Sequence, residues 1–328
     1  MLLIKRFLFL LLFFAGLLAG ALAYYSFRPL SLPSLPFEFS VNQGSSLKTT
    51  ARQLQQIGVL NNDLIFVSLA RILGKTTQIK AGNYELETAP TPLELLDLMT
   101  QGRGSQNEIG IIEGWSFNRL RDELNSNSTI LHDTLNLSEP EIMKHIGAKE
   151  TDAEGLFFPD TYYFANGCSD LSIFKRAYQN MQKHLQENWL TREQNLPVTS
   201  PYEALILASI IEKETGQAKD RGMIAGVFIN RLRKGMLLQT DPTVIYGMGE
   251  RYRGKLHKQD LQRDTRYNTY IRPGLTPTPI ALPGLAAIEA ALHPAKTEAL
   301  YFVARGDGSS EFSESLEQHN RAVNRYLK

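Results

Sequence analysis

One carboxyl group, that of Glu214, has a position in the sequence that favours acid–base catalysis. Glu214 lies at the end of a segment with helical spacing, and on a helical wheel it falls between Leu207 and Ile210, inside the apolar face. Burial disfavours the charged form of a carboxyl group, and so does the negative end of a helix dipole. Both effects raise the pKa of a carboxyl group, as a general acid requires. The alternative is a structural carboxylate paired with an arginine from another element, such as Arg221 or Arg231.

The helix that positions Glu214 has clear start and stop signals. Ser200 as N-cap, Pro201 at the first helical position and Glu203 three residues after the cap predict a capping box. Gly216 predicts the end of the helix, because glycine favours the backbone conformation that terminates helices. We therefore expect Glu214 in the last turn.

A polar, turn-rich stretch from Gln239 to Pro283 is too long for an ordinary connection. Such stretches are usually functional or disordered, and the tyrosines in this one argue against disorder. It contains the candidate residues for lining a substrate-binding groove, which are Gln239, Asp241, Tyr246, Asn268 and Tyr270. Each of them can equally hold the stretch together, and both roles stay open.

The sequence lacks the motifs that are typical of metal sites, phosphate-binding loops and dinucleotide-binding folds. The six histidines are scattered, with no metal-ligand spacing, and no phosphate-binding or dinucleotide-binding glycine pattern is present. Cys168 is the single cysteine, so it cannot form an intrachain disulfide. The sequence implies no metal site and no organic cofactor. The net charge of +1 over 328 residues also gives no reason to expect a nucleic-acid partner.

The N-terminus predicts a membrane anchor. Lys5 and Arg6 precede an apolar run over 7–25, about the length that a membrane-spanning helix needs. The positive pair should stay in the cytoplasm, so that the remainder is exported. The alternative is a cleaved signal peptide, because Ala21-Leu22-Ala23 looks like a small-residue cleavage site.

Hydrophobic periodicity beyond the anchor predicts an α+β fold in two domains. We expect the cytoplasmic N-terminus and anchor over 1–28, a proline-containing linker over 29–36, a small α+β module over 37–105 and a larger mixed α+β domain over 106–328. In the small module, strands are expected near 39–41 and 79–86. In the larger domain, helices are expected near 116–124, 140–146, 171–190, 221–234 and 284–292, with a strand over 300–304.

Several motifs together resemble one known family. They are 208–215 (ASIIEKET), 227–232 (VFINRL), 239–247 (QTDPTVIYG) and 267–270 (YNTY), extended by 158–162, 301–304 and His319-Asn320. In this order they resemble the endolytic murein transglycosylases, the MltG or YceG-like family, over nearly the whole chain. One departure is at Thr276 and Thr278, where the family usually has proline and glycine.

The resemblance implies a single transmembrane helix, a LysM-like module and a catalytic domain whose acid is Glu214, the second glutamate of Glu212-Lys213-Glu214. It implies a lyase that cuts the MurNAc–GlcNAc bond within peptidoglycan strands and leaves 1,6-anhydro ends. The implied partners are glycan strands, the inner membrane and cell-wall synthases, with the catalytic domain in the periplasm. Two alternatives stay open: a non-catalytic glycan-binding scaffold, and a hydrolase that uses Asp241 together with Glu214.

Overall fold

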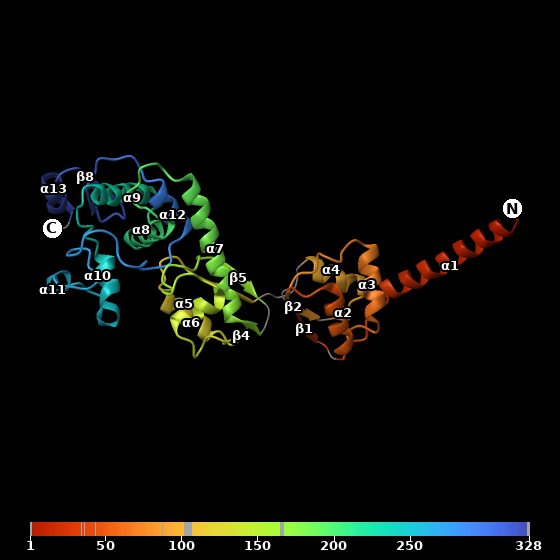
Figure 1. The fold of residues 1–328 in the computed structure, drawn as a ribbon. Coiled ribbons are helices and arrows are strands. Elements are labelled where there is room, and N and C mark those ends of the chain that lie inside the picture. Colours follow the sequence, from red (N-terminus) through yellow and green to blue (C-terminus); the bar gives the residue numbers. More distant parts are fainter. Residues whose placement is uncertain are drawn as a thin grey trace. The chain divides into compact units, whose positions relative to one another are not determined.

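The computed structural model describes residues 2–33, 35, 37–42, 44–86, 88–101, 107–164 and 167–326. The chain forms two compact units, one of residues 1–108 with 163–168 and the other of residues 109–162 with 169–328 (Figure 1). The division falls within β3 (Asn107–Gly110) and β5 (Thr161–Phe164), two strands that pair with each other.

The smaller unit contains α1 (Leu2–Phe27) and a small α+β module. The module comprises β1 (Phe37–Val41), α2 (Leu47–Gln56), α3 (Asp63–Ile72), β2 (Gly82–Leu86) and α4 (Pro92–Gln101). The two strands pair antiparallel, and Phe39 stacks on Tyr84 across them with ring centroids 5.2 Å apart. The expected elements are present, although β2 begins at Gly82 rather than near residue 79.

The first helix is long and apolar enough to cross a membrane. Its stretch Phe9–Phe27 has 19 residues and a mean hydropathy of 1.9, and no other helix in the described part of the chain meets the same test. The expected linker after it is not a free spacer throughout. Leu30 is buried in the module's core, and its N–H donates to the carbonyl of Pro90 at 2.8 Å.

The larger unit is mainly helical, with short strands between the helices. It contains α5 (Phe117–Ser126), β4 (Ile130–Leu131), α6 (Glu139–Ile146), β6 (Cys168–Ser169), α7 (Asp170–Thr191), α8 (Pro201–Glu214), α9 (Ala218–Arg233), α10 (Asp241–Met248), the 3-10 helix η1 (Gly249–Arg251), α11 (Lys258–Leu261), α12 (Leu285–Leu292), β7 (Tyr301–Ala304), β8 (Ser310–Ser313) and α13 (Leu316–Tyr326). Each sheet in the described residues has two strands. The predicted mixed α+β class is confirmed.

Helix α8 lies at the centre of the larger unit. Every residue from Ala204 to Ile211 is buried. The helix packs mainly against α12, and α7, α9 and α10 also contact it (Figure 1). Because neighbours cover it from several sides, α8 is buried all round and not only along the stripe that the helical wheel predicted.

Two of the expected end signals of α8 were wrong in detail. The Ser200 hydroxyl accepts from the Glu203 N–H at 3.1 Å, but the Glu203 carboxylate accepts from the Thr199 N–H at 2.6 Å, so the reciprocal half of the capping box is missing. At the other end Thr215, in an extended conformation, caps the helix, and Gly216 has no positive φ. Glu214 is nevertheless the last helical residue, as expected.

The stretch from Gln239 to Pro283 is less irregular than predicted. It contains α10 and α11, joined and followed by loops. Helix α10 starts with Asp241-Pro242, and proline is well suited to the first turn of a helix. That local signal is present in the sequence, but only two turns follow it, and they show no clear apolar stripe.

Helix α9 approaches the segment after α12 very closely. A Cβ added at Gly226 would lie 2.7 Å from the carbonyl oxygen of Ala295 and 2.7 Å from the methyl group of Thr297. A Cβ added at Gly222, one turn earlier, would lie 3.6 Å from the side chain of Ala295, which is ordinary contact. Of these two glycines, Gly226 is therefore the one that packing requires.

We expect Gly226→Ala to destabilise the larger unit by about 1–3 kcal/mol, because the backbone of 295 must move. The matched variant Gly222→Ala should be neutral or more stable by up to about 1 kcal/mol, because alanine favours the helix. Urea unfolding of the full chain in detergent, followed by tryptophan emission, tests this, since Trp115 and Trp189 both lie in the larger unit. Equal effects of the two variants would contradict the packing argument.

Candidate active site

Glu214 opens into a pocket of the larger unit. The pocket has a volume of about 460 Å³, within the range of small-molecule sites. It is lined by Glu214, Arg231, Leu238, Gln239, Asp241, Tyr270, Tyr301, Phe302, Val303, Leu316, His319 and Val323. Residues from the end of α8, from α9, from the start of α10, from β7 and from α13 thus meet around one carboxyl group.

Burial raises the pKa of Glu214 from its ordinary value to about 7. The negative charge of Asp241 acts in the same direction, whereas the hydrogen bond from Thr240 and the positive charge of Arg231 lower the pKa. The net effect keeps a substantial fraction of the group protonated near neutral pH. This is the condition that a general acid needs.

A buried threonine cluster holds the carboxyl group. The Thr240 hydroxyl donates to Oε1 of Glu214. The backbone N–H of Thr240 donates to Thr269 Oγ1 at 3.1 Å, and its carbonyl accepts from the Thr243 hydroxyl at 2.7 Å. Thr243 and Thr269 are themselves joined at 2.8 Å. Because the Thr243 proton is already donated, Thr269 is the donor of that bond, and every hydroxyl in the cluster has a fixed role.

Arg231 lies beside Glu214 without pairing with it. Its Nε donates to the carbonyl of Leu300 at 2.6 Å, and its Nη1 donates to the carbonyls of Leu237 and Leu238. No ion pair joins Arg231 to Glu214 in the described part of the chain. The structural-carboxylate alternative, with Glu214 neutralised by an arginine, therefore has no support in the geometry.

Three of the five candidate groove residues line the pocket with Glu214. Tyr270 donates its hydroxyl to Asp241 at 2.6 Å, so the two side chains act as one polar unit at the start of α10. Gln239 has a φ of 51°, a left-handed conformation that is uncommon for residues other than glycine. Backbone strain of this kind occurs often at functional sites. A substrate-binding role for these three stays a prediction.

The other two candidates point elsewhere. Asn268 is fully buried, and its amide donates to the carbonyls of Leu261 and Arg263 at 3.0 and 2.7 Å. These are loop-holding contacts. Tyr246 donates to Oε2 of Glu154 at 3.1 Å and packs edge-on against Tyr267. Neither residue lines the pocket, so of their two open roles the geometry favours the structural one.

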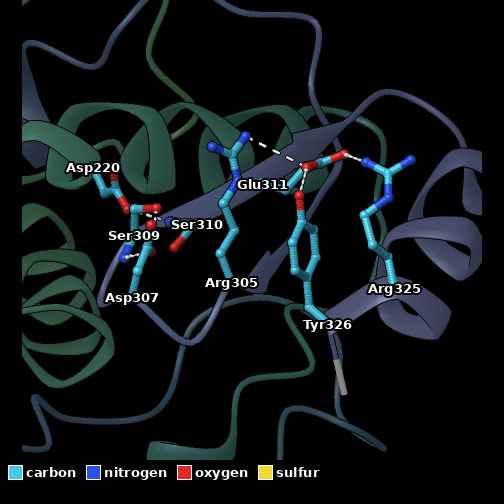
Figure 2. Close-up of polar contacts among 8 residues, drawn as sticks. All are labelled: Asp220, Arg305, Asp307, Ser309, Ser310, Glu311, Arg325 and Tyr326. Atoms are coloured by element: carbon cyan, nitrogen blue, oxygen red, sulfur yellow. Dashed lines mark hydrogen bonds and ion pairs between the residues drawn. The ribbon is translucent and has the colours of Figure 1, made fainter. Parts of the chain in front are cut away.

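The wall of the pocket opposite Glu214 is formed by β7 and α13. The family motifs at 301–304 and His319-Asn320 lie in these elements, but the sequence did not predict that they line the site. The rings of Tyr301 and His319 stack with centroids 5.3 Å apart. Glu311 ties this wall together, because its carboxylate accepts from Tyr326 at 2.8 Å and pairs with Arg305 and Arg325 (Figure 2). The arginines are exposed, so these ion pairs contribute little to stability.

A second buried carboxyl group, Glu154, was missed at the sequence level. Its side chain accepts from the Phe117 N–H at 3.0 Å and from the Tyr246 hydroxyl, and burial raises its pKa to about 7. It directly precedes Gly155, whose φ of 79° and contact with Pro279 leave no room for a side chain. The Glu-Gly pair before an aromatic segment was the available signal.

Comparison with known proteins gives the family. The YceG-like family model matches residues 39–325. The chain belongs to the YceG-like family. This agrees with the resemblance found in the motifs around Glu214, Thr240 and Arg231, all of which lie at or beside the pocket.

Relatives cover most of this YceG-like chain. An endolytic murein transglycosylase of Bacillus subtilis (strain 168) is 32% identical over 315 residues, which cover 88% of this chain and 84% of the relative. One from Streptococcus pneumoniae serotype 2 (strain D39) is 27% identical, and the match covers 98% of this chain but 65% of that longer protein. A crystal structure of a YceG-like protein from Listeria monocytogenes is 31% identical with a TM-score of 0.56, covering 87% of this chain and 98% of that one.

The raised pKa of Glu154 predicts how stability depends on pH. The folded state holds a proton at Glu154 that the unfolded state releases above about pH 4.5, so this group makes the fold less stable as pH rises from about 4.5 to 7. We expect Glu154→Gln, which mimics the protonated form, to remove up to about 3 kcal/mol of that loss. Urea unfolding followed by tryptophan emission across this pH range measures it.

Tyr246→Phe is the matched variant for this test. It keeps the Glu154 carboxyl group but removes a donor that stabilises its charged form. We therefore expect the loss of stability to continue to a higher pH than in the unaltered chain, because one retained proton sets the same slope and only the folded-state pKa moves up. Slopes that are the same in all three proteins would show that Glu154 does not hold a proton in the fold.

Proposed function

We propose that this chain is a lytic transglycosylase that cuts the MurNAc–GlcNAc bond within peptidoglycan strands and leaves 1,6-anhydro-MurNAc ends. The observation that carries the proposal is a single carboxyl group with a pKa near 7, half-buried in a pocket of about 460 Å³ that has both polar and apolar walls. The names of the relatives, endolytic murein transglycosylases, support the substrate and the reaction class. The enzyme would be a lyase that needs no metal or organic cofactor.

One carboxyl group suffices for this reaction. Protonated Glu214 donates its proton to the glycosidic oxygen as the bond between that oxygen and C1 of MurNAc breaks. The Glu214 carboxylate then accepts the proton of the sugar's own 6-hydroxyl, whose oxygen forms a new bond to C1. Atoms and charge balance, and Glu214 ends the cycle protonated. Because the nucleophile belongs to the substrate, its effective concentration is high and no bound water is needed.

The neighbours of Glu214 fit the two halves of this cycle. Burial favours the protonated acid of the first half, and Thr240 donates to the carboxylate of the second half. The charge of Arg231, held by backbone carbonyls, stabilises the same carboxylate from a distance. We propose that Gln239, Asp241 and Tyr270 contact the sugar, and that Tyr246 and Asn268 support the loop behind it.

We further propose that the chain is anchored in the inner membrane by α1, with a cytoplasmic N-terminus and a periplasmic active site. The supporting observations are the apolar stretch Phe9–Phe27 and the positive pair before it. From such an anchor the enzyme would cut nascent strands close to where they are made and would end their elongation near cell-wall synthases. The domain bounds 37–105 and 106–328, and the LysM-like character of the small module, are part of this proposal.

Two other functions give different products. A hydrolase using Asp241 with Glu214 would leave reducing ends, and it has some support because both carboxyl groups line the same pocket. A glycan-binding scaffold would leave strands uncut. Digestion of purified sacculi by the full chain in detergent, with mass spectrometry of the strand ends, separates the three outcomes.

We expect Glu214→Gln to reduce the release of anhydro ends by at least about 10²-fold, because the amide cannot donate or accept the reacting proton. The matched control is Glu212→Gln, two residues earlier. Glu212 accepts from the Gly284 N–H at 3.1 Å, a role that a glutamine oxygen keeps, so cutting should persist. Full activity of Glu214→Gln in a folded protein would overturn the assignment.

We expect Thr240→Val to move the alkaline limb of the kcat/KM profile to higher pH by about one unit, because the pKa of Glu214 rises when the donor to its carboxylate is lost. The maximal rate should fall, since the same carboxylate must form during the cycle. Thr240→Ser keeps the hydroxyl and should restore the original limb. A lower rate with no change in the limb would mean that Thr240 only supports the fold.

A further inference from the structure

Within the described residues, helix α3 of the small module leaves an apolar face without a partner. Leu64, Ile65 and Ile72 are 65, 38 and 69% exposed, and Leu73, which caps the helix, is 42% exposed. At ~100° per residue, Leu64, Ile65 and Ile72 fall on one side of the helix. Single exposed apolar side chains are ordinary, but a cluster of large ones on one short helix indicates a binding surface.

This face continues into a groove shared with the anchor helix. Its walls are Leu18, Ala19, Leu22, Ala23, Ser26 and Phe27 of α1, with Leu69, Ile72 and Leu73 at the end of α3 and Leu93 of α4. The groove has a volume of about 460 Å³ and lies within the smaller unit. Its one hydroxyl, that of Ser26, donates to the carbonyl of Leu22 at 2.7 Å, so every wall is effectively apolar.

The position of the groove along α1 decides what can fill it. Leu18 and Phe27 both line it, and they lie roughly 14 Å apart along the helix axis at 1.5 Å per residue. Both also belong to the stretch Phe9–Phe27 that is apolar enough to span a bilayer. The hydrocarbon core of a bilayer is about 30 Å thick. When α1 spans it, a groove of this length lies below the membrane surface.

Polar groups beside the groove fit the boundary of such a membrane. Arg28 follows α1 and lies over the ring of Tyr24, 5.8 Å from its centroid, and Tyr24 is 66% exposed. Aromatic and basic side chains of this kind are typical of the headgroup region. Arg71 is exposed and directly precedes Ile72. Both arginines can therefore reach lipid phosphates while the apolar face contacts acyl chains.

We propose that the end of α3 inserts into the outer leaflet of the membrane, where lipid acyl chains fill the groove between α3 and α1. The small module is then seated in the bilayer and does not hang from it by a free linker. The buried Leu30, just after α1, agrees with this, because it fastens the chain to the module at the membrane boundary. The inference rests on the proposed anchoring of α1 and not on the reaction.

Spin labels on the full chain in liposomes of phosphatidylethanolamine and phosphatidylglycerol test the inference. The label is placed at Ile72→Cys in a Cys168→Ser background, and its collisions with oxygen, which enters bilayers, are compared with those of a water-soluble nickel chelate. Phe14→Cys on α1 reports whether the anchor is inserted, and Gln56→Cys, exposed on α2, is the aqueous control. We expect Ile72 to favour oxygen over nickel several-fold more than Gln56 does.

The other outcomes each overturn the inference in a distinguishable way. If Phe14 is in the bilayer and Ile72 behaves like Gln56, the anchor stands and the seating of α3 is wrong. If Phe14 is itself exposed to nickel, the proposed anchor has failed. If Ile72 is shielded from both oxygen and nickel, protein fills the groove, and dilution with unlabelled chain then shows whether that protein is a second copy.

Discussion

The site in the larger unit depends on the free energy of ionising Glu214 at the end of the buried helix α8. Helix α8 is covered by α12, α7, α9 and α10, and the carboxyl group at its last position is half-buried and lines the pocket. Ionisation there is costly, and a pKa of about 7 keeps a substantial fraction of Glu214 protonated near neutral pH. A fully apolar site would prevent ionisation of the carboxyl group, whereas an ion pair with an arginine would keep it ionised at neutral pH. Thr240 gives an intermediate case, because its neutral hydroxyl can donate a hydrogen bond to Glu214 whether the carboxyl group is protonated or ionised.

The same physical arrangement occurs a second time, and α10 connects the two. Its N-cap residue Thr240 contacts Glu214, and Tyr246 in its second turn contacts Glu154. Glu154 is buried and Glu214 is half-buried, both have a raised pKa, and each accepts a hydrogen bond from a hydroxyl of this short helix or its N-cap. The position of α10 is therefore determined by two hydrogen bonds to groups outside it, together with the threonine cluster below its first turn. This accounts for the order of a helix too short to be stable alone.

The sequence predicted those features that local patterns determine. The long apolar first helix, the order of the helices and the unusual position of Glu214 all follow from spacing within one element. The partners of Glu214 were not predictable in this way, because Thr240 and Arg231 approach it from other elements. The left-handed Gln239 and the inward direction of Asn268 also depend on loop packing that no short-range pattern describes. The helical wheel assumed one covered face, and it failed for α8 because Leu205 and Ile206 are covered by neighbours as well.

The wall formed by α13 has a consequence for when the enzyme becomes active. Leu316, His319 and Val323 complete the pocket, yet they come long after Glu214 in the chain. Chains emerge from the ribosome with their N-terminal parts first. An incompletely synthesised molecule thus carries Glu214 without a finished pocket around it. Premature cutting by partly folded protein is thereby disfavoured by the order of the elements alone.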